Sequence, residues 1–201
     1  MIILGLDTTG ANCSACLVQD DQVLGHMSER IGRGHAERLA PMVATLFRDC
    51  DVRPDQVERV AVCTGPGSFT GLRVALSFAK GFALPRKLPV IGINALSVTY
   101  LMNPSKDDIG ALVFQDVKRN QFMFSHYESQ NAALNQVPDV GSFDDLRKAQ
   151  HISDRCLEVD DVDVIVMALA AVHFDPSAFP ADPLYARAPD AKLPGGVSVP
   201  S

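Results

Sequence analysis

One carboxylate and two hydroxyls follow directly on the first apolar run of the chain. Residues 2–7 read IILGLD, and Asp7 is followed by Thr8 and Thr9. A nuclease that uses two metal ions needs several carboxylates that converge on them. The first long helix expected after this point offers a single acid, Glu37. The pattern therefore does not predict a nuclease, and two interpretations of Asp7 stay open: it caps the turn with Thr8 and Thr9, or it is a vestigial phosphate contact.

Nucleotide binding is the second chemistry that these residues suggest. The stretch DTTGANCSA at 7–15 has the pattern of a phosphate-binding hairpin. In two-lobed kinases the nucleotide is held between the lobes, and both lobes supply glycine-rich turns where the backbone approaches phosphate. From residue 111 to residue 194 the only glycine is Gly141. Independent binding of ATP is therefore not expected, and an autonomous ATPase or small-molecule kinase remains the alternative hypothesis.

The most distinctive stretch is the glycine-rich sequence GPGSFTG at 65–71. Such a turn at a helix N-terminus can bind anions. It is not a Walker loop, because no Gly-Lys-Ser/Thr follows, and it is not a nucleophile elbow, because Pro66 replaces the first glycine of G-x-S-x-G. The pattern favours a tight strand-to-helix turn over an anion site.

Hydrolytic metal chemistry has little support. No two of the five histidines are four positions apart, so no helical metal-binding pair is expected. Cys13 and Cys16 form a C-x-x-C within an apolar strand, where side chains three positions apart point to opposite faces. We therefore expect structural thiols and no peptidase.

Composition narrows the class of protein further. The chain has 201 residues, 47% apolar and 21% charged, which is typical of a folded globular protein. The formal net charge of −6 disfavours a protein that binds nucleic acid on its own. No apolar run approaches the roughly 18 residues of a membrane span, and the start lacks the basic region of a signal peptide. Five cysteines fit a reducing compartment, so a cytoplasmic protein with no membrane contact is expected.

The elements that must position these residues follow from hydrophobic periodicity and turn signals. The order of the first hundred residues is β-β-β-α-β-α-β-α, which is typical of ribonuclease-H-like and actin-like or sugar-kinase-like (ASKHA) α/β lobes. Pro41 either kinks the first helix or marks its first turn. Ser68 is the expected N-cap of the second helix. The expected strands are 2–7, 13–18, 22–27, 59–63 and 89–94, and the expected helices are 35–47, 68–84 and 95–102.

A linker at Pro104 and the charged residues 106–108 separates this lobe from a shorter one. The predicted domains are an N-terminal lobe at 1–104, an abbreviated second lobe at 105–185 and an extended Pro-rich tail at 186–201. The second lobe is expected to hold strands at 110–116 and 121–127 and a helix at 142–149, with 163–172 either strand or helix.

The helix after the glycine-rich turn carries two apolar faces. One face carries Leu72, Leu76 and Ala79. A second face carries Val74, Phe78 and Phe82. A surface helix usually needs only one apolar stripe. The second face is either further internal core or a docking surface for another chain, and the pattern alone slightly favours core.

Several motifs resemble the TsaB (YeaZ) family. They are ILGLDTT, HAERLAPM, GPGSFTGLR, FAKGFAL and PVIGINAL, in matching order across residues 1–100, and the likeness continues more loosely through 115–127 and 183–194. GPGSFTGLR is highly specific to this group and its relatives. The second lobe is shorter than is usual for the family.

The resemblance implies a non-catalytic subunit with no catalytic residue and no metal. It implies pairing with the catalytic paralogue TsaD, with the ATPase TsaE as a further partner, in transfer of threonylcarbamoyl to the adenosine next to the anticodon of ANN-decoding tRNAs. It implies a homodimer when the chain is alone, contact with tRNA only through the complex, and no cofactor on the isolated chain. It leaves open whether ATP or ADP binds at a composite site in the complex.

The resemblance also implies that the first two helices form the docking face. It therefore favours docking over internal core as the role of the second apolar face of the helix at 68–84. Asp7, Thr8 and Thr9 stay candidates for a vestigial cofactor site, with turn-capping by Asp7 as the alternative. The expected partner-contacting residues are His35, Leu39, Met42, Val43, Leu46, Phe69, Leu72, Arg73 and Leu76.

Overall fold

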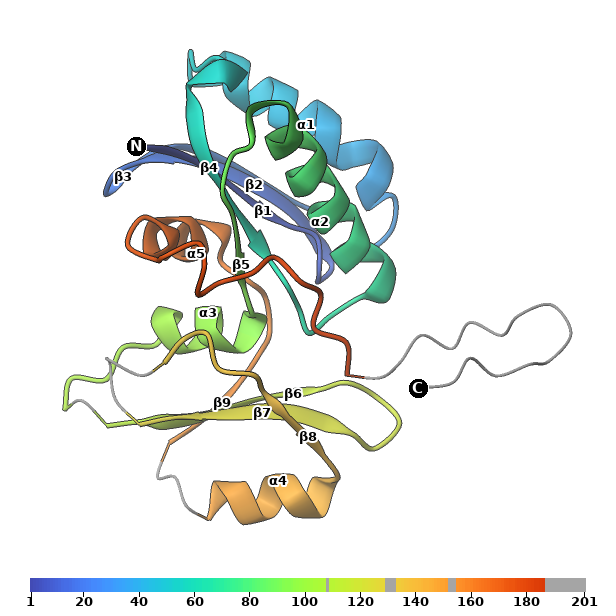
Figure 1. The fold of residues 1–201 in the computed structure, drawn as a ribbon. Coiled ribbons are helices and arrows are strands. Elements are labelled where there is room, and N and C mark those ends of the chain that lie inside the picture. The colour runs from blue at the N-terminus through green and yellow to red at the C-terminus, as the bar shows by residue number, and fades with distance from the viewer. Residues whose placement is uncertain (108, 129–132, 152–154, 187–201) are drawn as a thin grey trace, which may run out of the picture.

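A computed structural model describes residues 1–107, 109–128, 133–151 and 155–186 of the chain. Of the extended tail expected at 186–201, all but Ala186 lies outside the described residues. The fold is α/β and contains two sheets, stacked with helices between them and on their outer sides (Figure 1). The expected actin-like α/β class is confirmed. Within the described residues, no helix has both the length and the apolar character that crossing a membrane requires.

The first sheet has five strands in the order β3-β2-β1-β4-β5. β1 (Ile2–Asp7) is central and pairs antiparallel with β2 (Asn12–Gln19), which pairs antiparallel with β3 (Gln22–Arg30). β4 (Val57–Cys63) runs parallel to β1, and β5 (Val90–Ile93) runs parallel to β4. A meander followed by two parallel strands is the arrangement that the order of sequence elements predicts.

Two helices cover one face of this sheet, namely α1 (His35–Asp49) and α2 (Phe69–Ala83). Leu4 and Leu6 of β1 point into the core beneath them, as the two-residue period of a strand requires. Pro41 is exposed in the middle of α1, so it does not mark the first turn of that helix.

α5 (Val164–Ala171) packs on the opposite face of the same sheet. Gly5 makes this possible, because a Cβ at that position would lie 2.9 Å from the Cβ of Ala168. The sequence of residues 163–172 left open whether they form a strand or a helix. They are helical because the Asp163 side chain accepts hydrogen bonds from the N–H groups of Ile165 and Val166, at 2.8 and 3.2 Å. The second lobe predicted at 105–185 therefore contains a helix that covers the first sheet.

The second sheet has the order β8-β7-β6-β9. Its longer strands are β6 (Ala111–Asp116) and β7 (Phe122–Tyr127). The three-residue strands β8 (Asp139–Gly141) and β9 (Cys156–Glu158) extend it and were not predicted, because they lie in a polar stretch with no apolar alternation.

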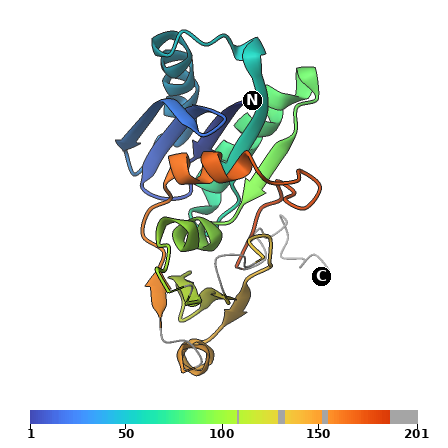
Figure 2. The ribbon, with the colours of Figure 1, turned by 90° about the vertical axis from the view of Figure 1, so that its left-hand side faces the viewer.

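Helices separate and flank the two sheets (Figure 2). α3 (Ala95–Met102) packs between α5 and the second sheet, and α4 (Phe143–Gln150) packs on β7 and β8. Two short 3₁₀ turns, at Pro54–Gln56 and Leu84–Arg86, lead into β4 and out of α2. α1 and α2 lie beyond the first sheet, at the outer surface of the molecule.

Candidate docking site

Asp7, Thr8 and Thr9 come together at the end of β1, but they bond to their own chain. One oxygen of Asp7, Oδ1, accepts hydrogen bonds from the Thr9 N–H at 3.0 Å and the Thr9 hydroxyl at 2.7 Å. The Thr8 hydroxyl donates to the carbonyl of Gly71 at 2.6 Å. All three residues are buried. The arrangement supports the turn-capping interpretation of Asp7.

Electrostatics at Asp7 also disfavour a ligand site. Burial raises the pKa of the Asp7 carboxyl above its usual value, and the hydrogen bonds from Thr9 oppose that shift. Burial likewise raises the pKa of the neighbouring Cys63 thiol. The Asp7 carboxyl would have to exchange its hydrogen bonds from Thr9 before it could hold a metal–phosphate group. Among the described residues, no three His, Cys, Asp or Glu side chains gather as metal ligands.

Cys13 and Cys16 lie on opposite faces of β2, as predicted. Cys13 belongs to the core under α1 and α2, and Cys16 to the core under α5. Burial raises the pKa of Cys13 to about 11 and that of Cys16 to about 12, so both are protonated, unreactive thiols at neutral pH.

The glycine-rich turn at 65–71 packs directly against the β1–β2 hairpin. The N–H of Ser68 donates to the carbonyl of Thr9 at 2.7 Å, and the Ser68 side chain caps α2 by accepting from the N–H of Gly71 at 3.2 Å. A Cβ at Gly71 would lie 1.9 Å from the carbonyl oxygen of Thr8. The N–H groups of Ser68 and Gly71 are thus both bonded within the chain, which supports the tight-turn interpretation.

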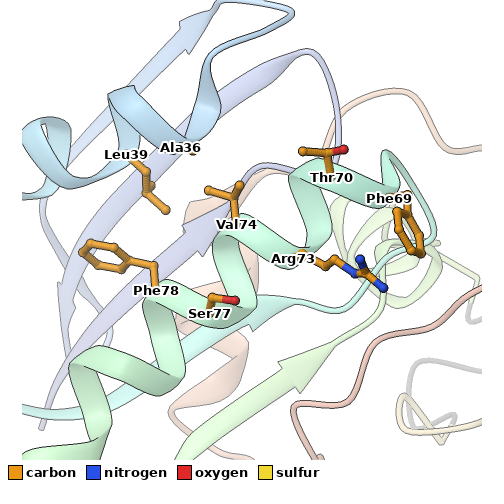
Figure 3. A pocket seen from close by; sticks show the side chains of 8 residues that line it. All are labelled: Ala36, Leu39, Phe69, Thr70, Arg73, Val74, Ser77 and Phe78. Carbon is orange, nitrogen blue, oxygen red and sulfur yellow. The ribbon is translucent and has the colours of Figure 1, made fainter. Parts of the chain in front are cut away.

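An open groove runs between α1 and α2 on the outer surface of the molecule (Figure 3). Its volume is about 580 Å³. α1 supplies small and aliphatic side chains, and α2 supplies aromatic, aliphatic and hydroxyl side chains with a single arginine. The lining residues are Ala36, Leu39, Phe69, Thr70, Arg73, Val74, Ser77 and Phe78.

The structure divides the nine predicted docking residues into three groups. Phe69, 40% exposed, and Arg73 lie on the outer surface and line the groove. Leu39 reaches the groove with a side chain that is only 1% exposed. The remaining six are buried and belong to the inner faces of α1 and α2, so they do not face outward: His35, Met42, Val43, Leu46, Leu72 and Leu76.

The reason for this division is that the most apolar face of an amphipathic helix covers its own sheet. Leu72, for example, is 1% exposed within the core formed with β1, β2 and β4. The second apolar face of α2 is the one that reaches the groove, through the half-buried Val74 and Phe78. The apolar pattern of α2 indicated this face in the sequence. No sequence pattern indicated the exposed lining residues Ala36, Thr70 and Ser77, because small and hydroxyl side chains are common on any helix surface.

A segment near the described C-terminal end adjoins the groove. The C-terminal strap, residues 179–186, crosses the edge of the first sheet beside β5. The N–H of Gly92 donates to the carbonyl of Phe179 at 3.0 Å, and the N–H of Leu184 donates to that of Thr64 at 2.8 Å. These bonds place the Tyr185 ring against Phe69, with ring centroids 5.0 Å apart.

The chain is similar in sequence and in fold to TsaD-related, TsaB and YeaZ proteins. The family model described as TsaD, tRNA N6-adenosine threonylcarbamoyltransferase, matches residues 19–168. The TsaB protein of Bacillus subtilis strain 168, named for tRNA threonylcarbamoyladenosine biosynthesis, is 30% identical over 140 residues, covering 69% of this chain and 61% of that protein. The TsaB protein of Escherichia coli K12 is 38% identical over 96 residues, covering 48% and 41%.

Other relatives match over nearly the whole chain. An uncharacterised protein of Mycobacterium tuberculosis H37Rv is 30% identical over 203 residues, covering 94% of this chain and 93% of that protein. A crystal structure of a Pseudomonas aeruginosa protein described as similar to peptidase YeaZ has a TM-score of 0.74 at 21% identity, covering 92% and 99%. A YeaZ structure from the same organism has a TM-score of 0.70 at 22% identity, covering the same shares. The chain spans about three fifths or less of the length of the two TsaB relatives. It spans nearly the whole length of the M. tuberculosis protein and of the two P. aeruginosa structures.

Proposed function

Because the chain belongs to the TsaD family, and within it to the TsaB (YeaZ) proteins, we propose that it is a non-catalytic subunit of a tRNA threonylcarbamoyladenosine-forming complex. In this proposal the α1–α2 groove docks the catalytic paralogue TsaD, and the docked chain favours the active arrangement of TsaD. The ATPase TsaE and tRNA are reached only within the complex. Alone, the chain pairs with a second copy through the same groove.

The observation that carries this proposal is the groove itself. The inner faces of α1 and α2 already cover the first sheet, yet Val74 and Phe78 remain half-buried and Phe69 is 40% exposed on the outer side. Exposed aromatic and aliphatic side chains that gather in one groove are typical of protein–protein contacts. Two helices that present such a groove can pair with two helices of a partner.

The state of Asp7, Thr8 and Thr9 supports a non-catalytic role. Their polar groups are bonded to one another and to the turn at 65–71, and no side chain of the three is exposed. Binding a nucleotide phosphate there would first require these bonds to break. The autonomous ATPase hypothesis therefore has no observation that favours it.

Reconstitution of the transfer reaction tests the proposed function. With TsaD and TsaE from the same organism, threonylcarbamoyl transfer to an ANN-decoding tRNA should depend on this chain, and the chain without TsaD should transfer nothing. Dependence is expected because docking helps only if the chain binds the active state of TsaD more tightly than the inactive state. Equal rates with and without the chain would contradict the proposal, as would transfer by the chain alone.

A further inference from the structure

Arg73 is the only charged side chain among the described residues that line the α1–α2 groove, and it is held in place. Its guanidinium carbon lies 3.8 Å from the centroid of the Phe69 ring. Its Nε donates a hydrogen bond to the phenol oxygen of Tyr185 at 3.2 Å. Phe69 and Tyr185 also contact each other, with an angle of 41° between their rings. The three side chains form one unit, called here the arginine clamp.

The two sides of the clamp come from distant parts of the chain. Phe69 is the first residue of α2, one turn before Arg73, so the helix sets the distance between them. Tyr185 is 112 residues further along and is positioned by the backbone hydrogen bonds of the C-terminal strap. An exposed arginine ordinarily samples many rotamers. The clamp restricts this one in advance, so less freedom is lost when it binds a ligand.

The clamp leaves one edge of the guanidinium open. Nε is used by Tyr185, whereas the two terminal nitrogens have no carboxylate partner among the described residues. These nitrogens present parallel N–H donors spaced to match the two oxygens of a carboxylate. A helix that fills the groove would also remove water from Arg73, and a desolvated cation without an anion is costly. The surface that docks here must therefore supply an anion.

We propose that the arginine clamp is a receptor for an Asp or Glu side chain of TsaD, and that it fixes the register in which TsaD lies along the groove. This inference rests on the proposed function. The rest of the groove favours a protein carboxylate over an RNA phosphate. Its other lining residues are uncharged, the chain has a net charge of −6, and a nucleic-acid surface needs several cations together.

Calorimetric titration of TsaD into the 201-residue chain tests this inference. Arg73→Gln should raise the Kd by about 30-fold or more, because it leaves a buried carboxylate of TsaD unpaired. Arg73→Lys should recover only part of the affinity, because an ammonium lacks the planar pair of donors. Tyr185→Phe keeps the ring but removes the hydrogen bond that orients Nε, and it should raise the Kd by about 3- to 10-fold.

Lys80→Gln is the matched control. Lys80 lies on the same helix and is exposed, and its pairing with Asp182 at 3.6 Å is a surface contact. The Lys80→Gln substitution removes the same charge from α2 and should change the Kd for TsaD by less than about 2-fold. Equal effects of Arg73→Gln and Lys80→Gln would overturn the inference. If the wild-type chain did not bind TsaD at all, the proposed function would fail instead.

A charge swap identifies the carboxylate. Arg73→Glu should prevent binding, and one Asp→Arg or Glu→Arg substitution on the docking helices of TsaD should restore it. Absence of rescue by any such substitution would overturn the inference. So would a loss of tRNA binding by the Arg73→Gln chain with its affinity for TsaD unchanged, which would make Arg73 a phosphate contact.

Discussion

A glutamate at Ser77 should weaken binding of TsaD by at least about 100-fold while leaving the chain folded. Ser77 is exposed on α2 and lines the groove between Val74 and Phe78. The added carboxylate would lie one helical turn from Arg73, so it would compete with TsaD for that guanidinium, and a docked helix would bury it in a groove whose other lining residues are uncharged. Glutamate is also a good helix former, so α2 itself should tolerate the change. The Kd is measured by calorimetry with TsaD from the same organism.

Gln22→Glu is the control for this substitution. Gln22 is exposed at the start of β3 and does not line the groove, and the change also adds one negative charge. We expect the control to bind TsaD as the wild type does and both variants to melt within a few degrees of it. Wild-type affinity in Ser77→Glu would place the docking surface elsewhere. Leu72→Asp is unsuitable for this purpose, because Leu72 is 1% exposed and the change would disrupt the core.

Gly71→Ala should destabilise the fold by at least about 3 kcal/mol. The added Cβ would lie 1.9 Å from the carbonyl oxygen of Thr8, and that atom belongs to the backbone of the β1–β2 hairpin and has little room to move. The change should also disturb the hydrogen bond from the Thr8 hydroxyl to the Gly71 carbonyl. Urea denaturation followed by circular dichroism gives the free energy of unfolding.

Gly81→Ala provides a comparison within the same helix. A Cβ at Gly81 meets no atom within 4 Å, so only the backbone effect remains. This substitution should stabilise the chain by about 0.5 to 1 kcal/mol, because alanine loses less backbone entropy than glycine in a helix. Equal stability of the two variants would contradict the close packing of the 65–71 turn against the hairpin.

The sequence predicted the first lobe well because its signals are local. Short apolar runs, buried on both faces, mark β1, β2 and β4, and Ser68 marks the start of α2. The helical state of 163–172 was also accessible, since Asp163 directly precedes the apolar run and caps it. The strands β8 and β9 were not accessible, because each has three residues and depends on pairing with a longer neighbour.

The candidate site was harder to predict for a geometric reason. The apolar pattern of α2 shows two faces but does not say which face meets the chain's own sheet. Leu72 and Leu76 were among the expected partner contacts, and both lie in the core. The contact between Arg73 and Tyr185 joins residues 112 positions apart, so no local pattern reports it. Phe69 and Arg73, which belong to the GPGSFTGLR motif, both line the groove.

The central claim is that the α1–α2 groove pairs this chain with TsaD. The most direct test is light-scattering mass after size exclusion, for the 21.7 kDa chain alone and mixed with TsaD from the same organism, with and without Mg-ATP. We predict a homodimer for the chain alone and, in the mixture, its replacement by a complex with one copy of each protein. A chain that stays separate from TsaD under both conditions would contradict the account.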